Sequence, residues 1–298
     1  MKKSTDIKIF NIIGYSILLI IALICLIPFL LVLMGSLTEE KEIIMNGYSL
    51  FPSKISLTAY KTALEEPMAI VRAYGVTVSL TVLGTSIGLF IVAMTGYVLQ
   101  RKDFEWRNKV SFFFYFTTLF SGGLVPWYIL MVKYLHLKDN YLALLLPPLL
   151  SVFNIIIMKS YIAGIPQALT ESAKIDGAGD FQIFIKVILP LIKPALATVG
   201  LFIALAYWND WYNSMLFINN EKLFSLQYYL YKIVNNIEAY KNILSQAGGS
   251  TIGSVIEMPT ESLKMALAII VTGPIILLYP FVQKYFVSGV TIGAVKGW

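Results

Sequence analysis

Few residues of this 298-residue chain combine in a pattern that could catalyse a reaction. It holds one histidine, His136, and one cysteine, Cys25, so the usual nitrogen and sulfur ligands of a metal site lack partners. No Walker A signature occurs, which excludes ATP binding by a P-loop. No nucleophile elbow of a hydrolase occurs either. The candidate acids of the second half show no partner pattern: Asp210, Glu221, Glu257 and Glu261. We therefore predict no catalytic residue, no metal site and no cofactor on this chain; a membrane enzyme or an assembly scaffold is the alternative from another class.

The residue types that remain suit contact with another protein, and they lie close together in the stretch "ESAKIDGAG", Glu171–Gly179. Pro166 suits a first helical position, and Thr170–Gly177 makes about two helical turns. Gly177 and Gly179 permit a sharp bend, after which Asp180 is a good N-cap for a second helix. The pattern predicts two short helices that meet at a glycine elbow.

Such an elbow would form a compact knob with a defined contact surface. Glu171 and Asp176 provide acidic contact points, while Ala173 and Ala178 give a low profile that fits a cleft. The alternative is an amphipathic surface loop whose charges are simply solvated.

The elements that must position this knob are membrane helices. The chain is 57% hydrophobic and 13% charged, with a mean hydropathy of +0.74, whereas soluble domains carry about a quarter charged residues. Runs of about 18 or more apolar residues indicate spanning helices, since a bilayer leaves no partner for open backbone groups. We predict an all-α integral membrane protein of one domain, residues 1–298, with six spans at about 11–36, 73–100, 110–132, 140–160, 190–209 and 265–284.

Basic residues set the expected orientation. The short loop "RKDFEWRNK", Arg101–Lys109, is the clearest cytoplasmic segment. Both termini are then cytoplasmic, as is the knob within loop 161–189 between spans four and five, while 210–264 forms a long external loop. The first apolar run is about twice a signal-peptide core and lacks a cleavage site, so we predict a retained helix. The net charge of +6 needs no nucleic acid to explain it.

The order of residues in the knob resembles the EAA loop of bacterial ABC importer permeases, whose pattern is E-A-A, three residues, G, nine residues, then I-x-L-P. Here Glu171-Ser172-Ala173 precedes Gly177, and Val187-Ile188-Leu189-Pro190 follows at the same spacing. Ser172 and Val187 depart from the pattern by small changes that preserve shape. The resemblance implies a loop that docks into a cleft on an ATPase subunit through Glu171, Ser172, Ala173, Asp176, Gly177, Ala178, Leu189 and Pro190.

Further segments are similar to the maltose-type carbohydrate group, and more narrowly to the second permease subunit of oligosaccharide and uronate-oligosaccharide importers. They are "DGA" at Asp176–Ala178, "WND" at Trp208–Asp210 and the tail "YPFVQKYFVSGVTIGAVKG" from Tyr279. The resemblance implies a multi-pass protein of the bacterial cytoplasmic membrane without catalysis of its own. Its partners would be a second, different permease subunit, two ATPase subunits that carry ATP and Mg, and an extracellular solute-binding protein. Gly289–Trp298 would be a second cytoplasmic contact, or else a frayed end.

In such a permease, the segment that leaves the fifth span could line the sugar path. Tyr207, Trp208, Trp211 and Tyr212 offer flat faces with polar edges, and Asn209, Asp210 and Asn213 offer hydrogen-bond partners. An aromatic belt at the membrane interface explains the same residues equally well. The pattern of the knob does not distinguish a sugar importer from an importer of another solute. An ABC importer for amino acids, betaine or phosphate is therefore the alternative function.

Overall fold

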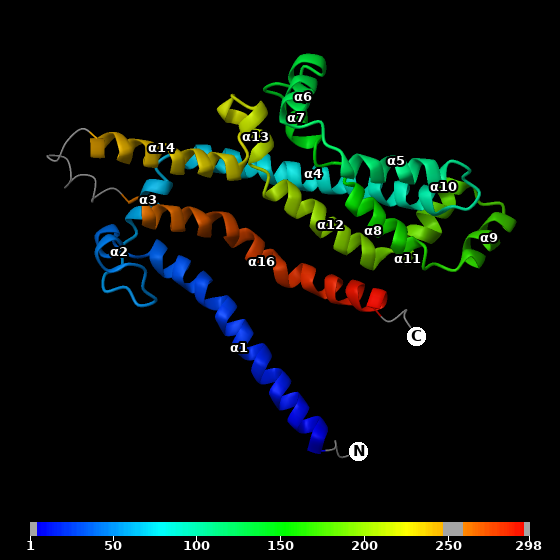
Figure 1. The fold of residues 1–298 in the computed structure, drawn as a ribbon, viewed down its shortest axis with the longest axis horizontal. Coiled ribbons are helices and arrows are strands. Elements are labelled where there is room, and N and C mark those ends of the chain that lie inside the picture. Colours follow the sequence, from blue (N-terminus) through cyan, green and yellow to red (C-terminus); the bar gives the residue numbers. More distant parts are fainter. Residues whose placement is uncertain (1–4, 247–258, 295–298) are drawn as a thin grey trace. The chain divides into compact units, whose positions relative to one another are not determined.

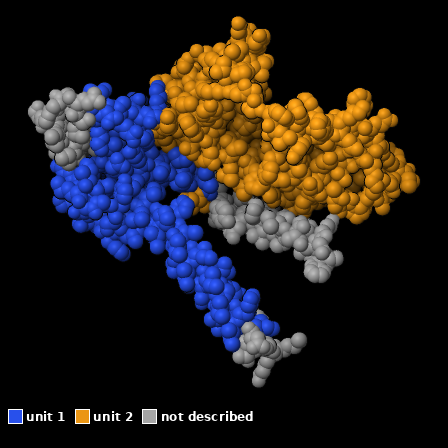
Figure 2. All heavy atoms as spheres, in the orientation of Figure 1, with its two compact units in different colours: residues 1–67, 232–275 blue, residues 68–231, 276–298 orange. Residues whose placement is uncertain are grey.

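The structure is a computed structural model, and it describes residues 5–246 and 259–294. All regular elements in these ranges are helices, and the one strand-like feature there is an isolated bridge between Thr38 and Ile55. The chain divides into two compact units (Figure 2). Unit 1 comprises Met1–Pro67 and Lys232–Ile275, and unit 2 comprises Met68–Tyr231 and Ile276–Trp298.

Unit 1 contains α1 (Thr5–Ser36), α2 (Glu40–Asn46) and α3 (Thr58–Ala63) (Figure 1). It also holds the larger part of α14 (Leu226–Gln246) and the first part of α16 (Glu261–Ala294). The carboxylate of Glu40 is buried and accepts hydrogen bonds from the backbone N–H groups of Glu261 and Ser262, at 2.9 and 3.0 Å. Because a helix begins with unpaired N–H groups, Glu40 caps α16.

Unit 2 carries the elements that position the site. Its long helix is α4 (Pro67–Gln100), and α5 (Arg107–Leu119) follows after a short loop. The remaining elements are α6 (Leu124–Ile129), η1 (Leu130–Tyr134), α7 (Leu142–Leu145), α8 (Val152–Ile162), α9 (Gln167–Ile175), α10 (Asp180–Ile183), η2 (Phe184–Ile188), α11 (Leu189–Leu191), α12 (Lys193–Trp208), α13 (Tyr212–Phe217) and η3 (Glu221–Leu223).

Two described helices are long and apolar enough to cross a membrane, Ile9–Ser36 within α1 and the whole of α4. Three further helix pairs qualify if each bent pair counts as one span, which gives up to five in the described part of the chain. The expected third span bends by 114° between α5 and α6, where Gly123 adopts a φ of +85°. The expected fourth span is interrupted between α7 and α8, where Pro147 and Pro148 cannot donate helical hydrogen bonds.

The described part of the expected external loop 210–264 is largely helical, since it includes α13, η3 and the whole of the 21-residue α14. Residues 247–258 of this expected loop lie outside the described residues. The expected tail contact, Gly289–Trp298, falls partly in α16, which ends at Ala294, and partly outside the described residues.

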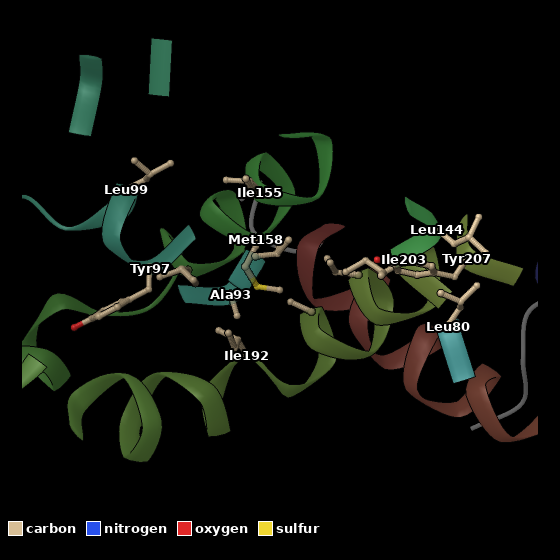
Figure 3. Packing of buried hydrophobic residues seen from close by; sticks show 14 of the residues in the cluster. Leu80, Ala93, Tyr97, Leu99, Leu144, Ile155, Met158, Ile192, Ile203 and Tyr207 are labelled. Atoms are coloured by element: carbon tan, nitrogen blue, oxygen red, sulfur yellow. The ribbon is translucent and has the colours of Figure 1, made fainter. Parts of the chain in front are cut away.

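The core of unit 2 is built where α7, α8 and α12 pack on α4 (Figure 3). Glycines of α4 permit the close approach of neighbouring helices. A Cβ on Gly84 would lie 2.2 Å from the ring of Tyr207, and one on Gly96 would lie 3.0 Å from Met158 Cγ. The Tyr207 hydroxyl donates a hydrogen bond of 2.6 Å to the Leu145 carbonyl, which ties α12 to the end of α7.

Candidate functional site

The predicted elbow lies between α9 and α10. Gly177 has a φ of +79°, a conformation that glycine adopts without the strain of a Cβ. The Ala178 N–H donates to the Ala173 carbonyl at 2.9 Å, and the Gly177 N–H donates to the Lys174 carbonyl at 3.0 Å. These two bonds form a Schellman motif, which ends α9 and satisfies its last carbonyls. A Cβ on Gly177 would meet no atom within 4 Å, so within this chain the backbone angle, not crowding, requires glycine.

The start of the second helix differs from the expectation. Gly179 is the N-cap, with ordinary extended angles that any residue can adopt, and Asp180 is the first helical residue. The predicted N-cap role of Asp180 is therefore wrong by one position. Its carboxylate instead lies 2.8 Å from an Arg101 guanidinium nitrogen.

The residues predicted to contact an ATPase divide by orientation. Glu171, Ser172, Asp176 and Gly177 are exposed on α9 and the elbow. Ala173 and Ala178 are half-buried and pack against the core of unit 2, so they fasten the elbow rather than present its surface. Leu189 also packs on this core, whereas Pro190 is exposed in α11, just before the chain bends by 86° into α12.

The apolar part of the knob surface was missed by the sequence reasoning. Ile175 is 86% exposed at the end of α9, and Phe181 is 64% exposed in the first turn of α10. Large apolar side chains left this open on a protruding element are typical of a contact surface. Their signal in the sequence is two bulky residues that flank the polar elbow. The knob thus offers apolar groups beside the carboxylates of Glu171 and Asp176.

A network of ion pairs connects the knob to the end of α4. The sequence did not predict this network. The guanidinium of Arg101 donates two hydrogen bonds to Asp103, of 2.9 and 2.5 Å, in addition to its contact with Asp180. Asp103 also accepts a hydrogen bond of 2.9 Å from Lys174 on α9. The hydrogen bonds from Arg101 and then Lys174 hold the pKa of Asp103 well below its usual range. The basic loop that served as a topology signal is therefore also a structural part of the site.

A hollow of about 480 Å³ lies between this end of α4 and α9. Its lining includes Tyr97, Arg101, Gln167, Glu171 and Lys174. The Gln167 side chain donates a hydrogen bond of 2.7 Å to Glu171, which orients the carboxylate at the rim of the hollow. The knob is thus held away from α4 over part of its length and joined to it at the ion pairs.

The aromatic segment after α12 also divides into buried and exposed parts. Tyr207 is 1% exposed and Trp208 is buried, with its ring 6.4 Å from the ring of Tyr74 on α4. The Trp208 indole N–H has no hydrogen-bond partner among the described residues. These two residues pack α12 in place and cannot offer an open aromatic face.

Asp210 and Asn213 form the turn that follows. The Asp210 carboxylate accepts hydrogen bonds from the Asn213 backbone N–H at 3.1 Å and from the Asn213 side chain at 2.8 Å. Burial raises the pKa of Asp210 from its ordinary value, against the opposing effect of these bonds. Ser225 donates to the Asp210 carbonyl at 2.8 Å, so the turn is fixed to the segment that precedes α14.

The exposed part forms a small aromatic and amide surface. Trp211 is exposed, and its ring centroid lies 4.8 Å from that of Tyr231 and 5.9 Å from that of Tyr212. Asn209 is exposed and accepts a 3.4 Å hydrogen bond from Gln227. Tyr231 and Gln227 belong to α14 and were not predicted. We call Asn209, Trp211, Tyr212, Gln227 and Tyr231 the outer aromatic group.

Within the described part of the chain, no group of three or more His, Cys, Asp or Glu side chains is placed to hold a metal ion. Asp103 and Asp180 are both paired with Arg101. The chemistry that the site can perform is contact through the knob and recognition through the outer aromatic group.

The chain matches the family model "binding-protein-dependent transport system inner membrane component" over residues 84–292. It therefore belongs to that family of ABC transporter permease components. The resemblance drawn from the EAA pattern is confirmed at this level.

Relatives resemble the chain over almost its whole length. The permease protein YtcP of Bacillus subtilis (strain 168), of a polygalacturonan/rhamnogalacturonan transport system, is 38% identical over 97% of this chain and 99% of its own. Protein LplC of the same organism is 38% identical over 92% of this chain and 90% of its own. A chain from the crystal structure of a bacterial ABC transporter involved in the import of the acidic polysaccharide alginate aligns with a TM-score of 0.77. That chain is 29% identical, over 96% of this chain and 99% of its own.

Proposed function

We propose that this chain is the permease subunit of a binding-protein-dependent ABC importer for oligosaccharides, with uronate-containing chains as the favoured class. The observation that carries the proposal is the near full-length similarity to a permease of a polygalacturonan/rhamnogalacturonan system. The similarity to a chain of an alginate importer supports an acidic substrate in particular. Neither comparison favours an amino acid, betaine or phosphate importer.

The proposed topology has six membrane crossings in the bacterial cytoplasmic membrane, with both termini and the knob in the cytoplasm. The bent pair of α5 and α6 then serves as the third crossing, and α12, after the bend at α11, as the fifth. Such bends are tolerated where irregular backbone is buried in protein or lines a water-filled pathway. A second permease subunit would complete the pathway, and two ATPase subunits would bind ATP and Mg. An extracellular solute-binding protein would deliver the sugar.

In this proposal the knob passes the movement of the ATPase to the membrane helices. The exposed side chains of Ile175 and Phe181 would enter a cleft of the ATPase, with Glu171 and Asp176 pairing with basic residues at its rim. The Schellman motif at Gly177 keeps α9 and α10 at one angle, so that the knob moves as a unit. Closure of the ATPase dimer on ATP would thereby displace the ends of the helices that carry the knob.

The outer aromatic group is the proposed sugar contact of this subunit. Aromatic faces stack on the apolar faces of sugar rings, and amide side chains bond their hydroxyls. Trp211 and Tyr231 offer such faces, and Asn209 with Gln227 offers amide groups beside them. Of the residues predicted for the sugar path, the proposal therefore retains Asn209, Trp211 and Tyr212, and gives Tyr207, Trp208, Asp210 and Asn213 a packing role.

The test is ATP hydrolysis and sugar uptake by the complete reconstituted complex, with uronate and neutral oligosaccharides of matched length. We expect uronate chains to stimulate hydrolysis and Gly177→Asp to abolish the stimulation. Trp211→Leu should raise the sugar concentration needed for half-maximal uptake, whereas Tyr134→Leu, at an exposed aromatic residue outside the group, should not. If no sugar stimulates hydrolysis and Gly177→Asp behaves like wild type, the proposal is wrong.

A further inference from the structure

We propose that Arg101 is a positioning residue that joins the knob to α4, so that the ATPase moves α4 directly as well as the helices adjacent to the knob in sequence. This inference rests on the proposed function, because it concerns how the same knob transmits movement. The ion pairs of Arg101 and their place at the end of α4 carry it.

The covalent connections of the knob are bent. Between α8 and α9 the helix axis turns by 77°, and between the α10–α11 segment and α12 it turns by 86°. A sharp turn between two helices lets one rotate relative to the other at little cost, so displacement of the knob is passed on only in part. A rigid noncovalent link from the knob to another long helix would transmit the rest.

Arg101 supplies such a link because all three of its guanidinium nitrogens contact a carboxylate. Two of its nitrogens bind Asp103 in a bidentate pair, and the third lies 2.8 Å from Asp180 on α10. Asp103 in turn binds Lys174 on α9 at 2.9 Å. Both helices of the knob are therefore tied to one guanidinium, whose planar geometry fixes the angle between its partners.

The link is better shielded than an ordinary surface ion pair. The Arg101 side chain is only 20% exposed, although its partners are about half exposed. One turn earlier on α4, the ring of Tyr97 stacks on Phe184 of η2, with centroids 5.5 Å apart, and the Arg101 guanidinium lies 5.8 Å from the Tyr97 ring. Phe184 is buried. An apolar contact thus supports the ionic contact, and both join the end of α4 to the segment that follows the elbow.

The other end of α4 contacts residues directly adjacent to the outer aromatic group. Tyr74 contacts the ring of Trp208, which directly precedes Asn209. Thr77 accepts a 2.8 Å hydrogen bond from the backbone N–H of Leu226, at the start of α14, the helix that carries Gln227 and Tyr231. With 34 residues, α4 is about 51 Å long. A single helix therefore runs from the ion pairs of the knob at one end to residues directly adjacent to the outer aromatic group at the other, within unit 2 (Figure 1).

The matched control comes from the neighbouring residue. Lys102 carries the same charge and is exposed, and no ion pair of it occurs among the described residues. Arg101→Gln and Lys102→Gln therefore remove one positive charge each from the same loop, and only the first breaks the link. Asp180→Asn removes the α10 arm alone and leaves the Arg101–Asp103 pair, which provides a milder variant if Arg101→Gln prevents assembly.

The experiment measures sugar taken up per ATP hydrolysed by the complete complex in proteoliposomes, with binding protein and the sugar that stimulates wild type. We expect Arg101→Gln to lower this ratio by roughly fivefold or more, the low end of ordinary coupling energies, while the ATPase subunits still copurify. Lys102→Gln should keep the wild-type ratio, and Arg101→Lys should restore part of it. Because both act on one link, Arg101→Gln combined with Asp180→Asn should lower it no further than Arg101→Gln alone.

A merely structural role would reduce the amount of assembled complex and leave the ratio unchanged. If Arg101→Gln and Asp180→Asn transport as much sugar per ATP as Lys102→Gln, the link to α4 plays no part in coupling and the inference is wrong. That result differs from a failure of the proposed function, in which wild type itself would respond to no sugar and Gly177→Asp would have no effect.

Discussion

The contact between Gly84 and Tyr207 gives a prediction whose size follows from the structure. A Cβ on Gly84 would lie 2.2 Å from two ring carbons of Tyr207, far inside van der Waals contact. The ring is 1% exposed and its hydroxyl is bonded to Leu145, so it has no room to move aside. Overpacking of this kind costs about 1–3 kcal/mol, and loss of the hydrogen bond adds about 1 kcal/mol. We expect Gly84→Ala to destabilise the protein by about 2–4 kcal/mol.

The assay is thermal unfolding of the purified complex in detergent. At about 2–4 °C per kcal/mol for units of this size, the apparent Tm should fall by roughly 4–16 °C. The control is Gly75→Ala on the same helix, where a Cβ meets no atom within 4 Å and alanine should be neutral or stabilising. In a Tyr207→Ala background the extra effect of Gly84→Ala should disappear. Equal stability of Gly84→Ala and Gly75→Ala would refute the reasoning.

Three further predictions concern other parts of the chain. Gly177→Ala should cost the elbow about 1–2 kcal/mol, because alanine is strained at positive φ, and should slow sugar uptake, whereas Gly179→Ala should not; equal uptake by both would contradict the Schellman assignment. Burial raises the pKa of Asp210, so this carboxyl group keeps its proton to a higher pH in the folded protein than in the unfolded chain. The protonated group therefore contributes to folding stability below the unfolded pKa, and the contribution is lost as the pH rises through the folded pKa. Asp210→Asn should therefore gain thermal stability relative to wild type from about pH 4 to about pH 7, and the opposite trend would exclude burial as the dominant effect. Glu40→Gln should destabilise unit 1 by about 2–3 kcal/mol, because it weakens the cap of α16; a melting curve that matches that of the exposed variant Glu65→Gln would show that the cap contributes little.

Features that depend on neighbours along the chain could be predicted from the sequence. Long uncharged runs indicated membrane helices, and two of them, Ile9–Ser36 and Pro67–Gln100, are continuous helices of sufficient length. The spacing from Glu171 to Pro190 identified the family and the two short helices, and the elbow lies at Gly177. These properties are local, because apolar periodicity, helix capping and left-handed backbone angles depend on a few consecutive residues.

The direction in which side chains face was not accessible in the same way. Ala173 and Ala178 looked like a surface that would fit a cleft, but they pack inward, and Ile175 and Phe181 are the exposed groups. The aromatic segment likewise reads as one patch, yet Tyr207 and Trp208 are buried. Tyr207 and Trp208 end α12, whereas Trp211 and Tyr212 follow it, so the point at which the helix ends decides which of these aromatic residues are exposed.

The sequence by itself determined the class of protein, two continuous helices long enough to span a membrane and the position of the glycine elbow, since hydropathy and backbone preference act within single segments. Only the tertiary structure decided that Arg101 binds Asp180 directly and Lys174 through Asp103, and that the ring of Tyr231 lies beside that of Trp211. Lys174 and Asp103 are 71 positions apart, and Tyr207 and Leu145 are 62 apart. Such contacts arise when separate helices pack, and the packing depends on which glycines permit close approach and on where each helix bends.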